Sequence, residues 1–278
     1  MPRTNERIAA VDAGASLAKV ALAGEPTGVR LESGSSLDLE AVARRVEALS
    51  PERVALTGCG ASWLAARLAL PTGIFDEFAA WGAGARHLLA RGVADAPERF
   101  LMVSLGTGTS VVLVEPASVR RVGGTALGGG TLLGLGRALL GVSTFGEIAA
   151  LAARGDRHEV DLVLSDIYAP GAIALPDWAT VASFGRLARD GAHAVSREDL
   201  AAGVVHLVSE NVGLLCGGLA QALGVRDVAV GGSTVPGNAA LVETLTRLVG
   251  AFGCATHVLE DAAYAGALGA IELLRARA

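Results

Sequence analysis

The residues best suited to carry out chemistry follow the ends of two apolar runs. After residues 8–11 come Asp12, Gly14 and Ser16, and Lys19 lies seven residues beyond the aspartate. In such a turn, backbone N–H groups can face an anion, and the carboxylate can hold Mg²⁺ through water. The lysine can reach a phosphate as a point charge. An ordinary hairpin with an aspartate-stabilised tip is the alternative interpretation.

A second turn of this kind follows the apolar run 100–105. Its five residues are Gly106, Thr107, Gly108, Thr109 and Ser110. Two glycines allow close backbone approach and three hydroxyls offer donors, which suits a phosphate oxygen. A tight hairpin that needs positive φ is the alternative for this turn alone. Together, the two turns predict a β/γ-phosphate held between two facing hairpins.

The segment 121–131 is the most specific in the chain. Arg121 precedes five glycines within eight positions, namely Gly123, Gly124, Gly128, Gly129 and Gly130. An arginine fork matches a carboxylate, and the N-terminus of a following helix attracts anions. We expect a loop over 121–130 and a helix over 131–140. A flexible linker fits poorly because Leu127 and Leu132 demand packing.

Two shorter segments offer further candidates. Gly231 and Gly232 stand between a strand and a helix, where a nucleobase can lie against bare backbone, although a structural turn explains them equally well. Asp76 and Glu77 follow a short strand and open a helix. An acidic residue there usually caps the helix, but Glu77 could instead face a cleft as a general base.

These turns require a particular set of elements around them. Apolar runs predict strands at 8–11, 17–23, 53–57, 74–75, 100–105, 111–114, 227–230 and 256–259, with helices between most of them. Each half of the chain opens with strand, small-residue turn and strand, which indicates a weak internal duplication. The proline-terminated stretch 92–97 is the best boundary. We therefore expect an α/β protein with two lobes, 1–97 and 98–278, and a ligand cleft between them.

Composition excludes several classes of function. The chain has 278 residues, 51% hydrophobic and 18% charged, with a net charge of −5 and 4% aromatic residues. A nucleic-acid reader needs a basic face, and a membrane span needs about 18 uncharged apolar residues; neither pattern is present. The polar start predicts no signal peptide. Three separated cysteines indicate free thiols in a cytoplasmic protein, and the five histidines have no metal-ligand spacing, so we expect them to be surface or core residues.

In these segments the sequence resembles the type II pantothenate kinases of the acetate/sugar kinase, heat-shock protein and actin superfamily. The resembling segments run in order along nearly the whole chain: 8–20, 75–78, 103–110, 120–136, 166–168, 182–185, 231–233 and 264–270. The resemblance implies two ribonuclease H-like lobes of the actin-like ATPase fold. It also implies transfer of a phosphoryl group from ATP to pantothenate, giving 4′-phosphopantothenate, the first step of coenzyme A biosynthesis.

The resemblance also implies roles for individual residues. Asp12 would hold Mg²⁺ through water, Glu77 would be the general base, and Arg121 would bind pantothenate near its carboxylate. Thr109 and Ser110 would line the substrate site. The remaining candidates would border ATP and its phosphates: Gly14, Ser16, Lys19, Gly106, Thr107, Gly108, Gly128, Gly129, Gly130, Gly231 and Gly232.

One position departs from the family pattern. The family usually has Gly-Gly-Thr in the first turn, where this chain has Gly14, Ala15 and Ser16. If Ala15 needed a positive φ, its methyl group would cost roughly 1 kcal/mol or more. A non-catalytic nucleotide sensor is therefore one alternative function, and another small-molecule kinase, such as a sugar kinase, is the second.

The resemblance implies a homodimer as well. The apolar helical stretch 198–223 could form its interface, although a core helix is an equally good interpretation.

Overall fold

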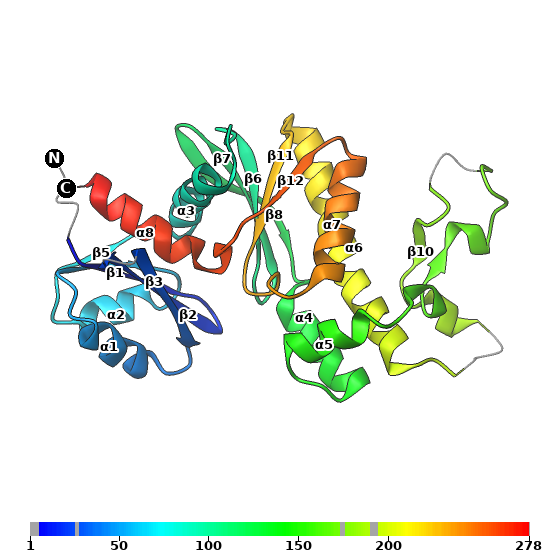
Figure 1. Ribbon diagram of the computed structural model, residues 1–278, viewed down its shortest axis with the longest axis horizontal. Helices are drawn as coiled ribbons and strands as arrows, with labels where there is room; N and C mark the ends of the chain where they lie inside the picture. The colour runs from blue at the N-terminus through cyan, green and yellow to red at the C-terminus, as the bar shows by residue number, and fades with distance from the viewer. Residues whose placement is uncertain (1–5, 26–27, 173–175, 190–193, 278) are drawn as a thin grey trace.

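The chain folds into five alternating layers of helices and sheets (Figure 1). The computed structural model describes residues 6–25, 28–172, 176–189 and 194–277. Within this part, two five-stranded sheets alternate with three helical layers, and buried apolar side chains form three clusters between them. The architecture matches the expected α/β class with two lobes.

The first sheet has the strand order β3-β2-β1-β4-β5. Its strands are β1 (Ile8–Ala13), β2 (Leu17–Glu25), β3 (Gly28–Ser35), β4 (Arg53–Thr57) and β5 (Thr72–Ile74). β2 pairs antiparallel with β1 and β3, whereas β4 runs parallel to β1 and β5. Every residue of β1 is buried, because helices cover both faces of this central strand.

The second sheet repeats this topology with the order β12-β11-β6-β7-β8. Its strands are β6 (Phe100–Leu105), β7 (Thr109–Glu115), β8 (Ser118–Thr125), β11 (Asp227–Gly231) and β12 (Ala255–Val258). An antiparallel meander is again extended by two parallel strands on the side of its first strand. The internal duplication expected from the repeated strand–turn–strand layout is therefore confirmed.

The middle layer consists of α3 (Glu77–Gly92) and α8 (Ala265–Ala276). The two helices pack closely because glycines lie at their contact: a Cβ at Gly84 would overlap the carbonyl oxygen of Ala265, and one at Gly269 that of Ala80. α8 also contacts β1, β2 and β4, so the end of the chain returns to the first sheet. The division into lobes 1–97 and 98–278 stays a prediction.

The outer helices cover the two remaining sheet faces. α1 (Leu39–Ala48) and α2 (Ala61–Arg67) lie on the first sheet. The apolar cluster on the second sheet includes α4 (Gly129–Leu135), the π-helical turn η1 (Gly136–Leu140), α5 (Phe145–Ala152), α6 (Arg197–Leu223) and α7 (Ala239–Ala251).

By length and composition, α6 could cross a membrane, and the bent pair formed by 129–140 and 145–152 passes the same test. However, 67% of the most apolar window of α6 is buried inside the protein, where the helix packs against α5 and α7. Most of α6 is therefore a core helix. This was one of the two interpretations of its sequence, the other being a dimer interface.

A small segment projects beyond α6 at the right of Figure 1. It contains β9 (Leu162–Val163) and β10 (Thr180–Ala182), with the short 3-10 turns η2 (Arg157–Glu159), η3 (Leu164–Asp166) and η4 (Gly185–Ala188); a further turn, η5 (Ala262–Tyr264), precedes α8.

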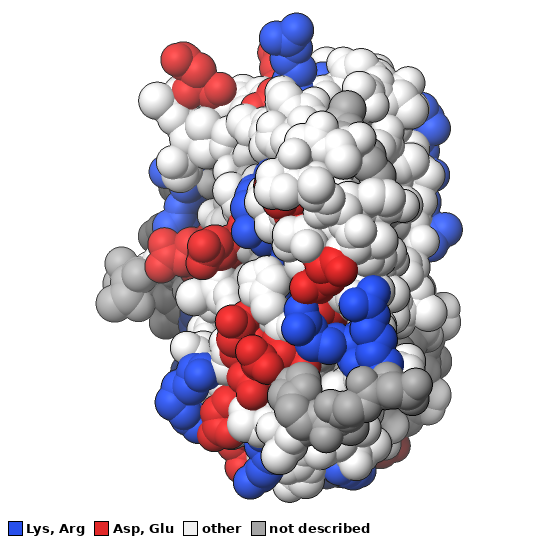
Figure 2. Space-filling view, turned by 90° about the vertical axis from the view of Figure 1, so that its right-hand side faces the viewer, with Lys and Arg blue, Asp and Glu red and all other residues white. Residues whose placement is uncertain are grey.

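On the face shown in Figure 2, basic and acidic side chains are interspersed, so this face carries no basic stripe.

The structure corrects one expectation about local structure and adds a strand that the sequence did not predict. The predicted loop 121–130 is wrong, because β8 continues to Thr125 and α4 begins at Gly129. The first two glycines of this segment give no strand pattern in the sequence, but they belong to β8. In this strand Gly124 has a φ of 155° and the pairing with β7 shifts register. β3 was not predicted, because it is a largely exposed edge strand with many polar residues.

Candidate active site

The first turn joins β1 to β2 and carries a pair of opposite charges. The Gly14 N–H donates to the carbonyl oxygen of Leu17 at 3.1 Å, which closes the turn. Asp12 and Lys19 are directly paired across the two strands, so their side chains share one face of the sheet. Asp12 is only 3% exposed. Burial raises its pKa, while the Lys19 charge and a hydrogen bond from Trp81 act in the opposite direction.

Ala15 does not have the positive φ that would make its methyl group costly. Among the described residues other than glycine, a positive φ occurs at Ser50, Phe184 and Asp261. The backbone at Ala15 is therefore one that any L-residue adopts, and the roughly 1 kcal/mol penalty considered for this position does not arise. The departure from Gly-Gly-Thr leaves the first turn intact.

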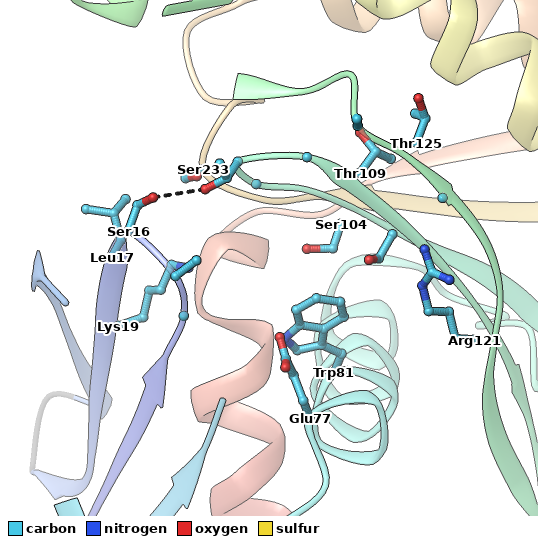
Figure 3. Close-up of a pocket in the computed structure, with 18 residues that line it drawn as sticks. Ser16, Leu17, Lys19, Glu77, Trp81, Ser104, Thr109, Arg121, Thr125 and Ser233 are labelled. Carbon is cyan, nitrogen blue, oxygen red and sulfur yellow. Dashed lines mark hydrogen bonds between the residues drawn. The ribbon is translucent and has the colours of Figure 1, made fainter. Parts of the chain in front are cut away.

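The second turn joins β6 to β7 and meets the first. The Gly106 N–H donates to the carbonyl oxygen of Gly108 at 2.9 Å. The hydroxyl groups of Ser16 and Thr107, 91 residues apart in sequence, form a 3.1 Å hydrogen bond between the two tips, drawn as a dashed line in Figure 3. The two turns therefore converge on one point, as the pair of motifs predicted.

A cavity of about 510 Å³ lies beside this meeting point. Many of the candidates from the sequence line it: Gly14, Ser16, Lys19, Glu77, Gly106, Thr107, Gly108, Thr109, Ser110 and Arg121. In Figure 3, Ser16 approaches from the first turn and Lys19 from the start of β2. Arg121 approaches from β8 on the opposite side, and Glu77 from the start of α3 between them. The cavity thus combines cationic, hydroxyl and carboxylate groups from both sheets.

Glu77 begins α3, directly after its N-cap. The Asp76 carboxylate accepts a hydrogen bond from the Ala79 N–H at 2.9 Å, so Asp76 supplies the capping that either acidic residue could have provided. Glu77 is left free to line the cavity. Burial, followed by the nearby charges of Asp12 and Asp76, raises its pKa, and Lys19 opposes the shift. A carboxylate with a raised pKa is a better proton acceptor.

Asp12 lies behind the main cavity. It lines an adjoining pocket of about 20 Å³, whose wall shares Lys19, Trp81 and Ser104 with the larger space. Its Oδ1 is buried and has no hydrogen-bond partner in the described part of the chain. No group of three or more His, Cys, Asp or Glu residues there could hold a metal ion by itself. A metal at Asp12 would therefore need other oxygen ligands.

On the substrate side, the hydroxyl and cationic groups are not equally available. Arg121 is exposed and lines the cavity. Ser110 is partly exposed there, and Thr125 of β8 lines the same wall. The Thr109 hydroxyl donates to the carbonyl oxygen of Leu127 at 2.8 Å, which ties the second turn to the segment before α4. Thr109 has a structural hydrogen bond that its sequence context did not predict.

Gly128, Gly129 and Gly130 lie against the second turn and do not line the main cavity. The N–H groups of Gly129 and Gly130 donate to the carbonyl oxygens of Gly106 and Thr107, both at 2.8 Å. A Cβ at Gly128 would lie 2.7 Å from the Gly108 backbone. These glycines therefore fix the shape of the second turn, and their predicted contact with nucleotide stays a prediction.

Gly231 and Gly232 lie at the end of β11, beside a second cavity. This space has a volume of about 640 Å³, and its wall includes Gly232, Val235, Val242 and Tyr264. At Gly232, with a φ of 114°, a Cβ would overlap the Leu105 backbone, so the position requires glycine. Gly231 instead packs closely against Ala262.

Several residues that line the main cavity were not site candidates from the sequence; those with polar or aromatic side chains are Trp81, Ser104, Thr125 and Ser233. Trp81 lies four residues after Glu77, and this spacing on one helical face was a usable signal. Ser104 is paired with Ser110 across β6 and β7 and could have been found from strand alternation. Ser233 was noted only as part of a glycine turn.

The chain is similar to known proteins over most of its length. The profile of the family described as Fumble matches residues 89–272. A type II pantothenate kinase from Oceanobacillus iheyensis is 31% identical over 262 residues, covering 94% of this chain and 97% of the relative. One from Staphylococcus aureus is 30% identical over 222 residues, covering 80% of this chain and 83% of the relative.

Solved structures of similar fold are more distant in sequence. A ROK family glucokinase from Streptomyces griseus aligns with a TM-score of 0.59 at 14% identity, covering 96% of this chain and 98% of that chain. A ROK hexokinase from Thermus thermophilus gives 0.53 at 17% identity, covering 95% and 96%. These likenesses show the two-lobed actin-like ATPase fold. Together with the family match and the close relatives, they show that the chain belongs to the Fumble family of type II pantothenate kinases.

Proposed function

We propose that this protein transfers the terminal phosphoryl group of ATP to pantothenate, giving ADP and 4′-phosphopantothenate in the first step of coenzyme A biosynthesis. The observation that carries the proposal is the hydrogen bond between Ser16 and Thr107, because it brings both phosphate turns to one cavity. Glu77 and Arg121 line the same cavity. Membership of the Fumble family supports the choice of substrate.

The triphosphate of ATP would enter between the two turns. Gly14 and Ser16 would approach it from the first turn, and Gly106, Thr107 and Gly108 from the second. Lys19 supplies a positive charge in the same cavity. Entry of a phosphate at the tips would replace the Ser16–Thr107 hydrogen bond with contacts to phosphate oxygens.

The adenosine part would occupy the second cavity. Its wall is mostly apolar, and Gly232 and Ser233 connect it to the phosphate turns through the small pocket that contains Asp12. Such a space suits a nucleobase, since ligand pockets are largely apolar with few polar groups.

Mg²⁺ fits the residues around Asp12. The buried Oδ1 lacks a hydrogen-bond partner, and oxygen is the ligand type that Mg²⁺ prefers. Since no protein cage is present in the described chain, Asp12 would hold the ion through water while phosphate oxygens complete its shell. When bound, Mg²⁺ would neutralise negative charge on the β- and γ-phosphates.

Glu77 would take the proton of the pantothenate hydroxyl as the hydroxyl oxygen attacks the γ-phosphorus and ADP leaves. Arg121 would bind the carboxylate at the other end of pantothenate and so orient the hydroxyl. Ser110 and Thr109 would line this substrate arm.

A coupled ADP-release assay with pantothenate tests the proposal. Activity with pantothenate is expected, while Asp12→Asn and Glu77→Gln lower kcat, the latter by about 10²–10⁴-fold with nearly intact ATP binding. Arg121→Ala should mainly raise KM for pantothenate, whereas Arg120→Ala, on the neighbouring position of β8, should not. ADP release with a sugar and not with pantothenate would contradict the proposed substrate. Tight ATP binding without turnover of any substrate would instead favour the alternative function, a non-catalytic nucleotide sensor.

Location and assembly are part of the same proposal. We expect a cytoplasmic homodimer that binds neither nucleic acid nor membranes. Most of α6 is committed to the core, but Asn211, Leu214 and Gln221 form an exposed strip along it. Sedimentation velocity of the parent and of Leu214→Asp would test this strip as the dimer contact; a monomeric parent would contradict the dimer.

A further inference from the structure

Trp81 has no role in the mechanism described so far, although it lies between the two acidic residues of the site. It follows Glu77 by one helical turn on α3, so both side chains project from one face of the helix. It lines the main cavity as well as the small pocket that contains Asp12. Figure 3 shows the indole ring beside Glu77 at the centre of the cavity.

The carboxylate of Asp12 has few polar neighbours. Its Oδ2 accepts a hydrogen bond from the indole N–H of Trp81 at 3.4 Å, and its Oδ1 has no hydrogen-bond partner in the described chain. A Cβ at Gly58 would lie 2.9 Å from Oδ1, and one at Gly266 would overlap Oδ2. Glycines thus leave room for the carboxylate but supply no side-chain donor to hold it.

The indole ring is itself held in place. It packs edge-to-face against Phe78, with ring centroids 5.7 Å apart and an interplanar angle of 80°. A Cβ at Gly266 of α8 would lie 2.9 Å from its Cδ1, so the ring occupies a slot between the two helices of the middle layer. A restrained donor can fix the orientation of a buried carboxylate at little cost in entropy.

We propose that Trp81 is a positioning residue: its indole N–H holds Asp12 through Oδ2 and so orients the carboxylate for the water shell of Mg²⁺. This inference rests on the proposed function, because it concerns the same nucleotide site. Trp81 also keeps Asp12 in register with Glu77, since one turn of α3 carries both Glu77 and the indole donor.

Trp81→Phe tests the inference because it keeps an aromatic ring and removes the N–H. The affinity for ADP is measured by isothermal titration calorimetry with and without Mg²⁺. The variant should reduce the affinity gain from Mg²⁺ by about three- to tenfold, because a hydrogen bond to a charged group contributes to an equilibrium constant and this one, at 3.4 Å, is longer than most. ADP affinity without Mg²⁺ should stay unchanged.

The matched control is Trp63→Phe, an aromatic exchange at a tryptophan of α2 that is 40% exposed. It should leave both affinities unchanged. Trp81→His, which restores a ring N–H, should recover part of the Mg²⁺ effect. If Trp81→Phe keeps the parent's Mg²⁺ effect and only its melting temperature falls, Trp81 has a packing role and the inference is overturned.

A second readout covers the case in which Trp81→Phe fails to fold. The chain has three tryptophans, so Trp63→Phe combined with Trp178→Phe leaves Trp81 as the single indole fluorophore. Titrating Mg²⁺ in the presence of ADP should change its emission, and an unchanged emission at saturation would overturn the inference. Because these measurements need no pantothenate, an inactive parent whose ADP affinity still shows the Trp81-dependent Mg²⁺ effect would refute the substrate alone.

Discussion

At the residue scale, the site depends on two carboxylates whose surroundings disfavour their charged forms. Asp12 is buried almost completely and has one hydrogen-bonded oxygen. Glu77 is half-buried and lies near the negative charges of Asp12 and Asp76. Lys19 offsets part of this cost for both groups. Lys19 is also the single lysine of the chain, so amine-directed labelling would report on this cavity with little background.

The raised pKa of Glu77 predicts the pH dependence of catalysis. As the proposed general base, Glu77 would have to be ionised to accept a proton, so activity should be lost as pH falls through its pKa, which burial and nearby negative charge raise above 4.5. The acid limb of kcat/KM should therefore lie above the ordinary glutamate range. A pH–rate profile with pantothenate measures it. Glu77→Gln should abolish this limb, and an unshifted limb in that variant would exclude Glu77 as its source.

The charged carboxylate of Asp12 should destabilise the folded protein at neutral pH. Its folded-state pKa is raised above 3.8, so the folded protein binds this proton more tightly than the unfolded chain does. Stability then falls as pH rises from the unfolded pKa to the folded one, and the penalty persists above that window. Asp12→Asn should raise Tm at pH 7, by about 2–4 °C for each kcal/mol recovered.

The increase should vanish below about pH 3.8, where Asp12 is protonated in both states. Differential scanning calorimetry at several pH values measures this. Asp95→Asn, at an exposed carboxylate, is the control and should leave Tm unchanged. A lower Tm for Asp12→Asn at pH 7 would show that the Lys19 and Trp81 contacts outweigh the burial of the charge.

At the element scale, the start of α4 determines the shape of the second phosphate turn. Gly129 and Gly130 donate their N–H groups to carbonyl oxygens of this turn, and the Thr109 and Thr234 hydroxyls add two more bonds, to Leu127 and Gly106. In the proposed function, the glycine-rich segment would therefore act on a bound phosphate through the turn that it supports.

Gly129→Ala should damage this support. Its Cβ would lie 2.6 Å from the Thr234 Oγ1 and 2.9 Å from the Gly106 carbonyl oxygen, so the turn must shift. We expect a lower Tm and a KM for ATP raised by about tenfold or more, since backbone overpacking costs roughly 1–3 kcal/mol. Steady-state kinetics and thermal melts measure both.

Gly134→Ala is the matched control on the same helix, because its Cβ would meet nothing within 4 Å. It should leave KM unchanged and stabilise the helix by roughly 0.5–1 kcal/mol. Equal effects of the two substitutions on KM would contradict the role assigned to Gly129.

At the scale of the whole molecule, the two sheets are joined by α3 and α8. The central apolar cluster takes side chains from β1, from β6 and from both helices, so the sheets share one core layer. α3 carries Glu77 and Trp81, and α8 contacts both α3 and the first sheet. The distance between the two phosphate turns therefore depends on how these helices pack.

Gly84→Ala should alter that packing. Its Cβ would overlap the Ala265 backbone, which forces α8 away from α3. We expect a Tm lower by several degrees, since each kcal/mol shifts it by about 2–4 °C, and a lower kcat because Glu77 moves relative to the turns. Gly92→Ala, where a Cβ meets nothing within 4 Å, is the control on the same helix. A folded Gly84→Ala protein with the kinetics of the parent would show that catalysis does not depend on how α3 packs against α8.

The sequence was sufficient where the signal is local. The strands 53–57 and 100–105 were predicted with the bounds that the structure has, because short apolar runs end at glycine turns. The repeated strand–turn–strand layout indicated the duplicated sheet, and the acidic pair of Asp76 and Glu77 indicated the start of α3. The strands β3 and β8 were not predicted, because exposed polar residues and glycines do not give a strand pattern.

By itself, the sequence determined which residue types stand at strand ends and helix starts, and from these the family and the candidate carboxylates. Only the tertiary structure decided which of them meet. Ser16 and Thr107 are 91 residues apart, and Trp81 and Asp12 are 69 apart. Local spacing sets backbone conformation and which face a side chain occupies. A contact between distant segments depends on how two sheets dock around α3 and α8, which is a property of the packed core as a whole.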